Sequence, residues 1–230
     1  MILAIDTSTR YGGVALWSEG RSVSSVGWYS THNHTAELMP AIQHVLDRAQ
    51  IAPPDLSGIA VALGPGGFSA LRVGISAAKG LALPLKVPIA GVGTLEMEAF
   101  PYAGMGLPIR PLIDTGRDQV ASGLFQHSGG QWRRLREEYV CTPQELVESI
   151  STPTLLCGEG VHQRGEYLRR ALGANGVILD FHTAFPRLGA LAVLAAERLQ
   201  SGDVSPATIQ PLYLRRPSIG SPKAAQKVRQ

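Results

Sequence analysis

Cysteine, aromatic residues and long apolar runs are all scarce in this chain of 230 residues. The two cysteines, Cys141 and Cys157, lie in apolar contexts without CxxC spacing, which predicts buried thiols and no redox or metal role. No apolar run approaches the roughly 18 residues of a membrane span, and Asp6 interrupts the apolar N-terminus too early for a signal peptide. We therefore expect a cytoplasmic protein without membrane contact.

Acidic residues are absent from the C-terminal segment 215–230. This segment holds five of the 21 basic residues, so the rest of the chain has 16 basic against 18 acidic residues and a net charge of −2. The five are Arg215, Arg216, Lys223, Lys227 and Arg229. Such a tail either contacts nucleic acid through phosphates or is simply a solvated end.

A glycine turn joins a strand to a helix in residues 62–83, ALGPGGFSALRVGISAAKGLAL. Gly64, Gly66 and Gly67 suit backbone angles closed to other residues, and Ser69 is the expected N-cap of the helix. The turn lacks the lysine of a phosphate-binding P-loop, since the first lysine lies about three helical turns further on. Tight packing of strand and helix explains the glycines better. Small residues four apart on that helix form a strip that another helix could approach.

The hydrophobic pattern divides the chain into two similar units, each opening with a strand that ends in aspartate. The first unit has strands at 2–6, 13–18, 22–29 and 58–63 and helices at 35–50 and after the glycine turn. The second has strands at 108–114, 120–125, 131–140 and 154–157 and helices at 143–150, 163–172 and 187–200. Thr142, Pro143 and Glu145 predict a capping box at the start of the helix 143–150.

This repetition predicts an α/β, duplicated ribonuclease H-like (actin-like, ASKHA) fold with two lobes and mixed sheets flanked by helices. We expect a first lobe at 1–100, a second at 101–204, a segment 205–216 that packs back on the first lobe, and the basic tail 217–230.

In proteins of this fold, turns after the first strand of each unit face a phosphate and metal site between the lobes. Here the corresponding residues are Asp6, Thr7 and Ser8 in the first unit and Asp114 in the second, while Gly158 and Gly160 lie where an adenosine would be. A carboxylate can hold hydrated magnesium, and such turns offer amides and hydroxyls to phosphate. The alternative is that both aspartates only cap turns, as aspartate commonly does.

Other catalytic patterns are missing from the sequence. The six histidines form no HxxxH pair, and no spacing assigns a nucleophilic triad. We therefore predict no catalytic residues, no metal site and no cofactor beyond weak binding of ATP or ADP.

Several segments resemble the bacterial TsaB (YeaZ) family in order along almost the whole chain. These are ILAIDTST, HTAELMPAIQHVL, the glycine block 62–83, VPIAGVGTLE, PLIDTGRDQV, LLCGEGV and PLYLR. The resemblance implies a non-catalytic scaffold that binds and activates TsaD, a glycoprotease-like paralogue. TsaD transfers threonylcarbamoyl to the adenosine next to the anticodon of tRNAs that read codons beginning with A. It further implies a TsaE-like ATPase as a third component, a homodimer when the chain is alone, and contact with tRNA indirectly or through the tail.

The resemblance also provides a comparison with the enzyme. TsaD-like proteins carry two metal-binding histidines in a stretch similar to GVNHMEGHA, and the matching stretch here, GVGTLEMEA, has Thr94 and Glu98 at those positions. Threonine is a poor ligand for iron or zinc, so chemistry by this chain alone is not expected.

The resemblance places the partner-binding surface on the first two helices. The expected interface residues are His34, Leu38, Ile42, Leu71, Gly74, Ile75 and Ala78. The alternative for the apolar positions is ordinary core. From the interface reading, we expect Gly74→Arg to abolish partner binding and leave the fold intact.

A second function class stays open at this point, namely a small-molecule kinase or a metal-dependent hydrolase of the same fold. A kinase requires Mg-ATP binding, and a hydrolase of this kind requires a metal in the purified protein.

Overall fold

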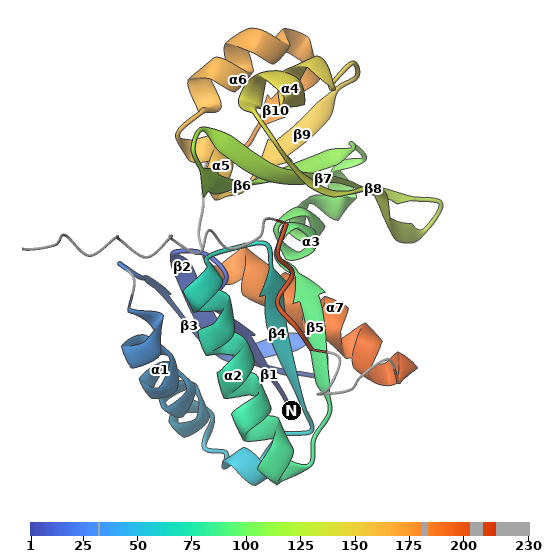
Figure 1. The fold of residues 1–230 in the computed structure, drawn as a ribbon. Coiled ribbons are helices and arrows are strands. Elements are labelled where there is room, and N and C mark those ends of the chain that lie inside the picture. The colour runs from blue at the N-terminus through green and yellow to red at the C-terminus, as the bar shows by residue number, and fades with distance from the viewer. Residues whose placement is uncertain (32, 181–183, 203–208, 215–230) are drawn as a thin grey trace, which may run out of the picture.

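Two lobes, each built around a mixed five-stranded sheet, lie one above the other in this computed structural model (Figure 1). The structure describes residues 1–31, 33–180, 184–202 and 209–214. The strand orders are β3-β2-β1-β4-β5 and β10-β9-β6-β7-β8. Read from opposite ends, these orders are the same, because in both sheets the first strand of the unit lies between its antiparallel hairpin partner and a parallel strand. The predicted duplicated ribonuclease H-like fold is confirmed.

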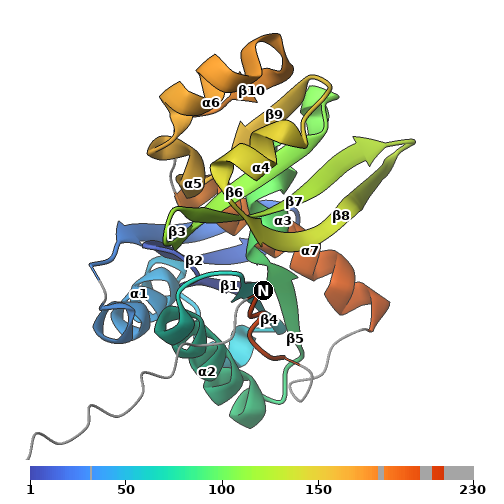
Figure 2. The ribbon, with the colours of Figure 1, turned by 45° about the horizontal axis from the view of Figure 1, so that its top comes forward.

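The first sheet contains β1 (Ile2–Asp6), β2 (Tyr11–Ser18), β3 (Arg21–Tyr29), β4 (Gly58–Gly64) and β5 (Ile89–Gly93). Two helices, α1 (His34–Ala49) and α2 (Phe68–Leu85), cover one face, and a third, α7 (Ala184–Ser201), covers the other (Figures 1 and 2). Side chains alternate between these faces. Leu3 and Ile5 of β1 point into the core under α1 and α2, and Ala4 points towards α7.

The face under α7 is made mostly of alanine, which lets that helix approach the sheet closely. Ala4, Ala15, Ala60, Ala62 and Ala90 are all nearly or fully buried there. We expected residues 101–204 to form the second lobe, but α7 packs on β1, β2, β4 and β5 of the first. The helix α7 therefore belongs to the first lobe and not to the second. The alanine face needs a helix to cover it, and α7 supplies the apolar stripe.

The second lobe contains strands β6 (Ile109–Gly116), β7 (Gln119–Ser128), β8 (Gln131–Cys141), β9 (Thr154–Cys157) and β10 (Gly176–Ile178). Its helices are α4 (Pro143–Glu148), α5 (Glu159–His162) and α6 (Gly165–Leu172), with the short 3₁₀ turn Gly173–Asn175. The predicted capping box of α4 is confirmed: the Glu145 amide donates to the Thr142 hydroxyl oxygen at 3.2 Å, and the Thr142 amide donates to the Glu145 carboxylate at 2.7 Å.

The start of α2 differs from the prediction. The N-cap is Gly67, not Ser69, and the helix begins at Phe68. Of the three glycines in the turn, Gly64 has a positive φ of 108°, whereas Gly66 is required by close approach, because a Cβ there would overlap the Ser8 carbonyl. The amide of Gly67 donates to that same carbonyl oxygen at 2.9 Å. The turn is thus packed directly onto the end of β1.

The lobes are joined by α3 (Thr94–Ala99) and the 3₁₀ segment Phe100–Met105, which the sequence pattern did not predict. Leu95 and Ala99 of α3 lie in the core of the second sheet, while Met97 packs under α7. Nearby, β8 places Glu138 against Gly93, where a Cβ would lie 3.0 Å from Oε1. Burial raises the pKa of Glu138 to about 7.

Gly66→Ala is expected to destabilise the protein by about 1–3 kcal/mol, because the added methyl group must displace the backbone of Ser8. Gly80→Ala is the matched control: nothing lies within 4 Å of a Cβ at this helical position, and alanine should stabilise by about 0.5–1 kcal/mol. Urea denaturation of both variants measures the difference. Equal stabilities would show that the turn is not packed on β1.

Glu138→Gln is expected to change the pH dependence of stability. Because the folded-state pKa is raised above the ordinary carboxyl value, the wild type keeps its full stability below about pH 4.5 and loses this contribution as pH rises to about 7. Glutamine cannot ionise, so the variant should match the wild type at pH 4 and melt at a higher temperature at pH 8. Identical melting temperatures at pH 8 would mean that the carboxylate is well solvated.

Candidate functional site

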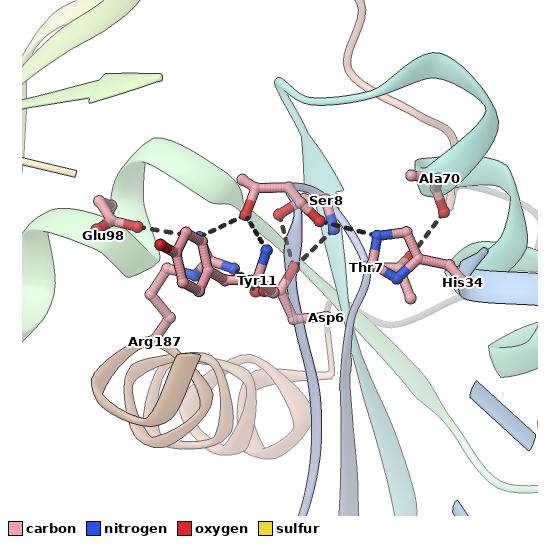
Figure 3. Close-up of polar contacts among 9 residues, drawn as sticks. Asp6, Thr7, Ser8, Tyr11, His34, Ala70, Glu98 and Arg187 are labelled. Carbon is pink, nitrogen blue, oxygen red and sulfur yellow. Dashed lines mark hydrogen bonds and ion pairs between the residues drawn. The ribbon is translucent and has the colours of Figure 1, made fainter. Parts of the chain in front are cut away.

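Asp6 lies fully buried at the end of β1, at the first of the two predicted phosphate turns. Its Oδ1 accepts hydrogen bonds from the Ser8 amide at 2.8 Å and the Ser8 hydroxyl at 2.6 Å (Figure 3). Thr7 points the other way and donates to the carbonyl oxygen of Ala70 in α2 at 2.6 Å. The turn therefore bonds to itself and to the start of α2.

The other oxygen of Asp6 is paired with an arginine of α7. Arg187 is 1% exposed, and its Nη2 lies 2.5 Å from Asp6 Oδ2 (Figure 3). The same nitrogen donates to the Tyr11 carbonyl oxygen at 2.5 Å, and Nη1 donates to Thr9 Oγ1 at 3.0 Å and to Glu98 Oε2 at 3.3 Å. Burial lowers the pKa of Arg187, but the charges of Asp6 and Glu98 outweigh burial and hold the pKa above its ordinary value. The guanidinium is a permanent cation here.

This arrangement does not suit hydrated magnesium at Asp6. Magnesium needs near-octahedral oxygen ligands and keeps several of its waters. Both Asp6 oxygens already accept hydrogen bonds, and the guanidinium lies against Oδ2. A divalent cation at this position would also meet the positive charge of Arg187.

The second turn repeats the pattern in a more exposed form. Asp114 Oδ1 accepts from the Gly116 amide at 2.7 Å, and its Oδ2 lies 3.3 Å from Nη1 of Arg164. Arg164 also lies 3.6 Å from Asp118. Each predicted phosphate turn thus has its aspartate bonded to the amide two residues on and paired with an arginine of the same chain.

Gly158 and Gly160, expected beside an adenosine, are explained by packing. Gly158 has φ 95°, and a Cβ there would lie 2.5 Å from the Leu112 carbonyl oxygen. A Cβ at Gly160 would lie 2.9 Å from the carbonyl carbon of Leu112. These glycines bring α5 close to β6.

Thr94 and Glu98, which match the two metal-binding histidines of TsaD-like proteins, lie on α3 and are buried. Glu98 pairs with Arg187, and its backbone carbonyl oxygen lies 3.5 Å from the Cys157 thiol sulfur of β9. Among the residues that the structure describes, no three His, Cys, Asp or Glu side chains gather in a way that could hold a metal ion. The sequence analysis missed Arg187 as a site residue, although an arginine beside an otherwise apolar helical stripe was a signal.

The seven expected interface residues are buried within the chain itself. His34, Leu38, Ile42, Leu71, Gly74, Ile75 and Ala78 all face the first sheet or the turn above it. Their side chains are therefore not on the surface, and the expected contact residues are corrected. A Cβ at Gly74 would lie 2.5 Å from Thr7 Oγ1, so Gly74→Arg would disrupt the fold instead of leaving it intact.

The outer faces of α1 and α2 carry small and apolar residues together with polar and charged ones. The small and apolar residues that are exposed or half-buried there include Ala36, Met39 and Pro40 on α1 and Ser69, Val73, Ser76, Ala77, Gly80 and Leu83 on α2. Polar and charged residues are exposed or half-buried on the same helices, namely Thr35, Glu37, Gln43, His44, Asp47 and Arg48 on α1 and Arg72 and Lys79 on α2. Met39 is 50% exposed and Leu83 is 63% exposed. We call this surface the α1/α2 outer face.

A cleft of about 490 Å³ opens between the first turn, the start of α2 and the second lobe. Arg10, His34, Phe68 and Asp114 are among its lining residues. His34 Nε2 lies 2.9 Å from the Thr9 carbonyl oxygen, which fixes the ring against the turn (Figure 3). The cleft offers hydroxyls, an arginine and a histidine to a small polar ligand.

Residues 209–213 pack back on the first lobe, and Leu214 packs against the core of the second sheet. The Leu212 amide donates to the Leu63 carbonyl oxygen at 2.7 Å, and the Tyr213 ring stacks on Phe68 with centroids 5.0 Å apart. Arg72 lies over Phe68 at 3.9 Å and donates to the Tyr213 hydroxyl at 3.2 Å. The tail residues predicted to touch tRNA begin at Arg215 and lie outside the described residues.

The fold and the turns define a two-lobed protein of the actin-like class, in which arginines pair with the aspartates of both phosphate turns. The activator of 2-hydroxyisocaproyl-CoA dehydratase from Clostridium difficile shares this fold, with a TM-score of 0.54 at 11% identity over 87% of this chain and 95% of that one. The family model for TsaD, tRNA N6-adenosine threonylcarbamoyltransferase, matches residues 29–199.

More similar proteins identify the family. The tRNA threonylcarbamoyladenosine biosynthesis protein TsaB of Bacillus subtilis is 33% identical, with 93% of each chain covered. The YeaZ structure from Pseudomonas aeruginosa superimposes with a TM-score of 0.75 at 29% identity, covering 93% of this chain and 99% of that one. The chain belongs to the TsaB (YeaZ) family, as the resemblance predicted. In the part of the chain that the structure describes, no helix is long and apolar enough to cross a membrane.

Arg187→Met is expected to destabilise the protein by about 3–5 kcal/mol, because it leaves the buried carboxylates of Asp6 and Glu98 without their cation. The double variant Asp6→Asn with Arg187→Met should recover part of this loss, since the asparagine side-chain oxygen can still accept from Ser8. Arg170→Met, at an ion pair whose side chains are 80% and 86% exposed, is the control. Denaturant titration measures all three, and a loss no larger than that of the control would contradict the network.

Proposed function

We propose that this chain is a non-catalytic scaffold subunit in tRNA threonylcarbamoyladenosine biosynthesis, which binds a TsaD-like protein and activates it. The observation that carries the proposal is the Asp6–Arg187 ion pair, because it occupies the carboxylate that a metal-dependent activity of this fold would need. The names of the TsaB relatives support the pathway.

Residues that cannot act as catalysts stand where related enzymes have reactive ones. Thr94 and Glu98 stand where TsaD-like proteins have histidines, and Glu98 is neutralised by Arg187. Asp114 is likewise paired, with Arg164. A buried carboxylate held by a guanidinium is a poor base and a poor metal ligand. The chain then contributes a surface, and the TsaD-like partner contributes the transfer chemistry.

The α1/α2 outer face is the surface we propose for the partner. Its small residues allow helices of a second protein to approach closely, and Met39 and Leu83 supply exposed apolar area. A partner with two similar helices would complete a four-helix arrangement, and a second copy of this chain would do the same when the partner is absent.

Two further components belong to this proposal through the family resemblance. A TsaE-like ATPase would join the pair, and tRNA would reach the complex through TsaD or through the basic segment 215–230. We propose no metal and no cofactor for the chain itself, apart from weak binding of ATP or ADP near the cleft.

The direct test is threonylcarbamoyl transfer to tRNA by the cognate TsaD-like protein, TsaE-like ATPase and adenylate-forming enzyme, with and without this chain. Transfer should require the chain, and the chain should give none when the TsaD-like protein is omitted. Transfer that is indifferent to the chain would refute the scaffold role.

Ser76→Arg is expected to weaken binding of the TsaD-like partner by at least about 2 kcal/mol, or roughly 30-fold, because a long charged side chain would stand in the middle of a close helix contact. Melting temperature should not change, since Ser76 is exposed. Ser151→Arg makes the same substitution at an exposed loop position of the second lobe. Calorimetric titration compares the variants, and equal affinities would remove α2 from the interface.

A further inference from the structure

The strand β8 stands apart from the rest of the second lobe. It is the edge strand of its sheet, and residues 133–137 are exposed on both strand faces, although alternate residues of a strand usually differ in burial. Figures 1 and 2 show the hairpin of β7 and β8 reaching past the helices of its lobe. This part of the strand is accessible from several sides.

Arginines are concentrated on this exposed stretch, whose sequence is RRLRE. Arg133 donates to the side-chain oxygen of Gln131 at 2.8 Å, and the Arg136 guanidinium lies 4.0 Å from the centre of the Tyr139 ring. Only Arg134 has a carboxylate partner among the described residues, Glu137 at 3.4 Å. Two guanidinium groups therefore keep their charge uncompensated.

The neighbouring glutamate does not cancel this charge. Glu138 faces Gly93 at the junction of the lobes, and burial raises its pKa to about 7, so that it is partly protonated at neutral pH. The outward side of β8 is consequently positive, although the chain without its tail has a net negative charge.

Charged residues also protect exposed strand edges from pairing with other chains, which is an alternative explanation for these arginines. The other hairpin edge of the molecule, β3, has the sequence RSVSSVGWY with a single charged residue. In addition, β8 has two irregularities of register, between the partners of Ser122 and Leu124 and of Leu124 and Phe125, which already bend the edge. Protection of the strand edge against pairing with other chains therefore does not explain why β8 carries three arginines.

We propose that Arg133, Arg134 and Arg136 form a binding surface for the phosphate backbone of tRNA. The inference rests on the proposed function, since the pathway supplies the tRNA. Guanidinium groups bind phosphate oxygens through paired N–H donors, which makes arginine the favoured residue for this contact. The cation–π contact with Tyr139 holds the Arg136 guanidinium in place and so lowers the entropic cost of the contact. Sequence-independent binding of this kind suits a subunit that must accept several tRNAs.

The test is tRNA binding by the full chain and by its complex with the TsaD-like partner, over a series of salt concentrations. The triple variant R133Q/R134Q/R136Q should bind tRNA at least about tenfold more weakly at 0.15 M salt, and the slope of log K against log salt should fall by about 2 to 3. The control R21Q/R117Q/R170Q removes the same charge from three exposed positions on other elements and should lose much less affinity.

Other results would overturn the proposal. Equal affinity and slope in the triple variant and the wild type would leave the arginines without an RNA role. If the triple variant keeps its affinity for tRNA but no longer forms a complex with the TsaD-like partner, as measured by light scattering, the arginines bind an acidic protein surface and not tRNA. Binding of tRNA by the chain alone is measured without the transfer reaction, so failure of this surface and failure of the scaffold role are separate results.

Discussion

The buried ion pair between Asp6 and Arg187 is the interaction on which the rest of the structure depends. It joins the end of β1 to α7, and through Glu98 it reaches α3, the helix that connects the lobes. Charges removed from water are costly unless they are closely paired and hydrogen bonded, and here the guanidinium also bonds Thr9 and Tyr11. The network therefore tolerates little movement. Its residues come from parts of the sequence as distant as positions 6, 98 and 187, so it forms only when the whole first lobe is assembled.

The same interaction is the basis for proposing a binding role for the molecule. In proteins of the actin-like class, a charged ligand would be bound and its charge neutralised in the cleft between the lobes. In this chain the aspartates of both turns are neutralised internally, by Arg187 and Arg164. The glycine turn, which looks like a phosphate loop in sequence, packs its backbone on Ser8. The surfaces that we propose for other macromolecules lie on the outside, on the α1/α2 outer face and along β8.

The local structure was largely predictable from the sequence, because strand alternation, helical period and the Thr142 capping box depend on residues close together in the chain. Where each element packs in the fold was not predictable in the same way. The apolar stripe of α7 predicted a helix, but only the alanine face of the first sheet determines that α7 crosses to the first lobe. Leu38, Ile42 and Leu71 form stripes that sequence cannot assign to core or interface, and the structure assigns them to core. The position of Arg187 beside an apolar stripe was a signal, but its partners could not be identified because they are remote in sequence.

The measurement that tests this account most directly is a calorimetric titration of the purified chain with ATP, with magnesium and then with EDTA. Since Arg187 already pairs with Asp6, the account predicts that any binding is weak and the same in both titrations. Micromolar binding that requires magnesium and disappears in Asp6→Asn would contradict it. That result would mean that the guanidinium leaves Asp6 and that the cleft works as a metal and nucleotide site.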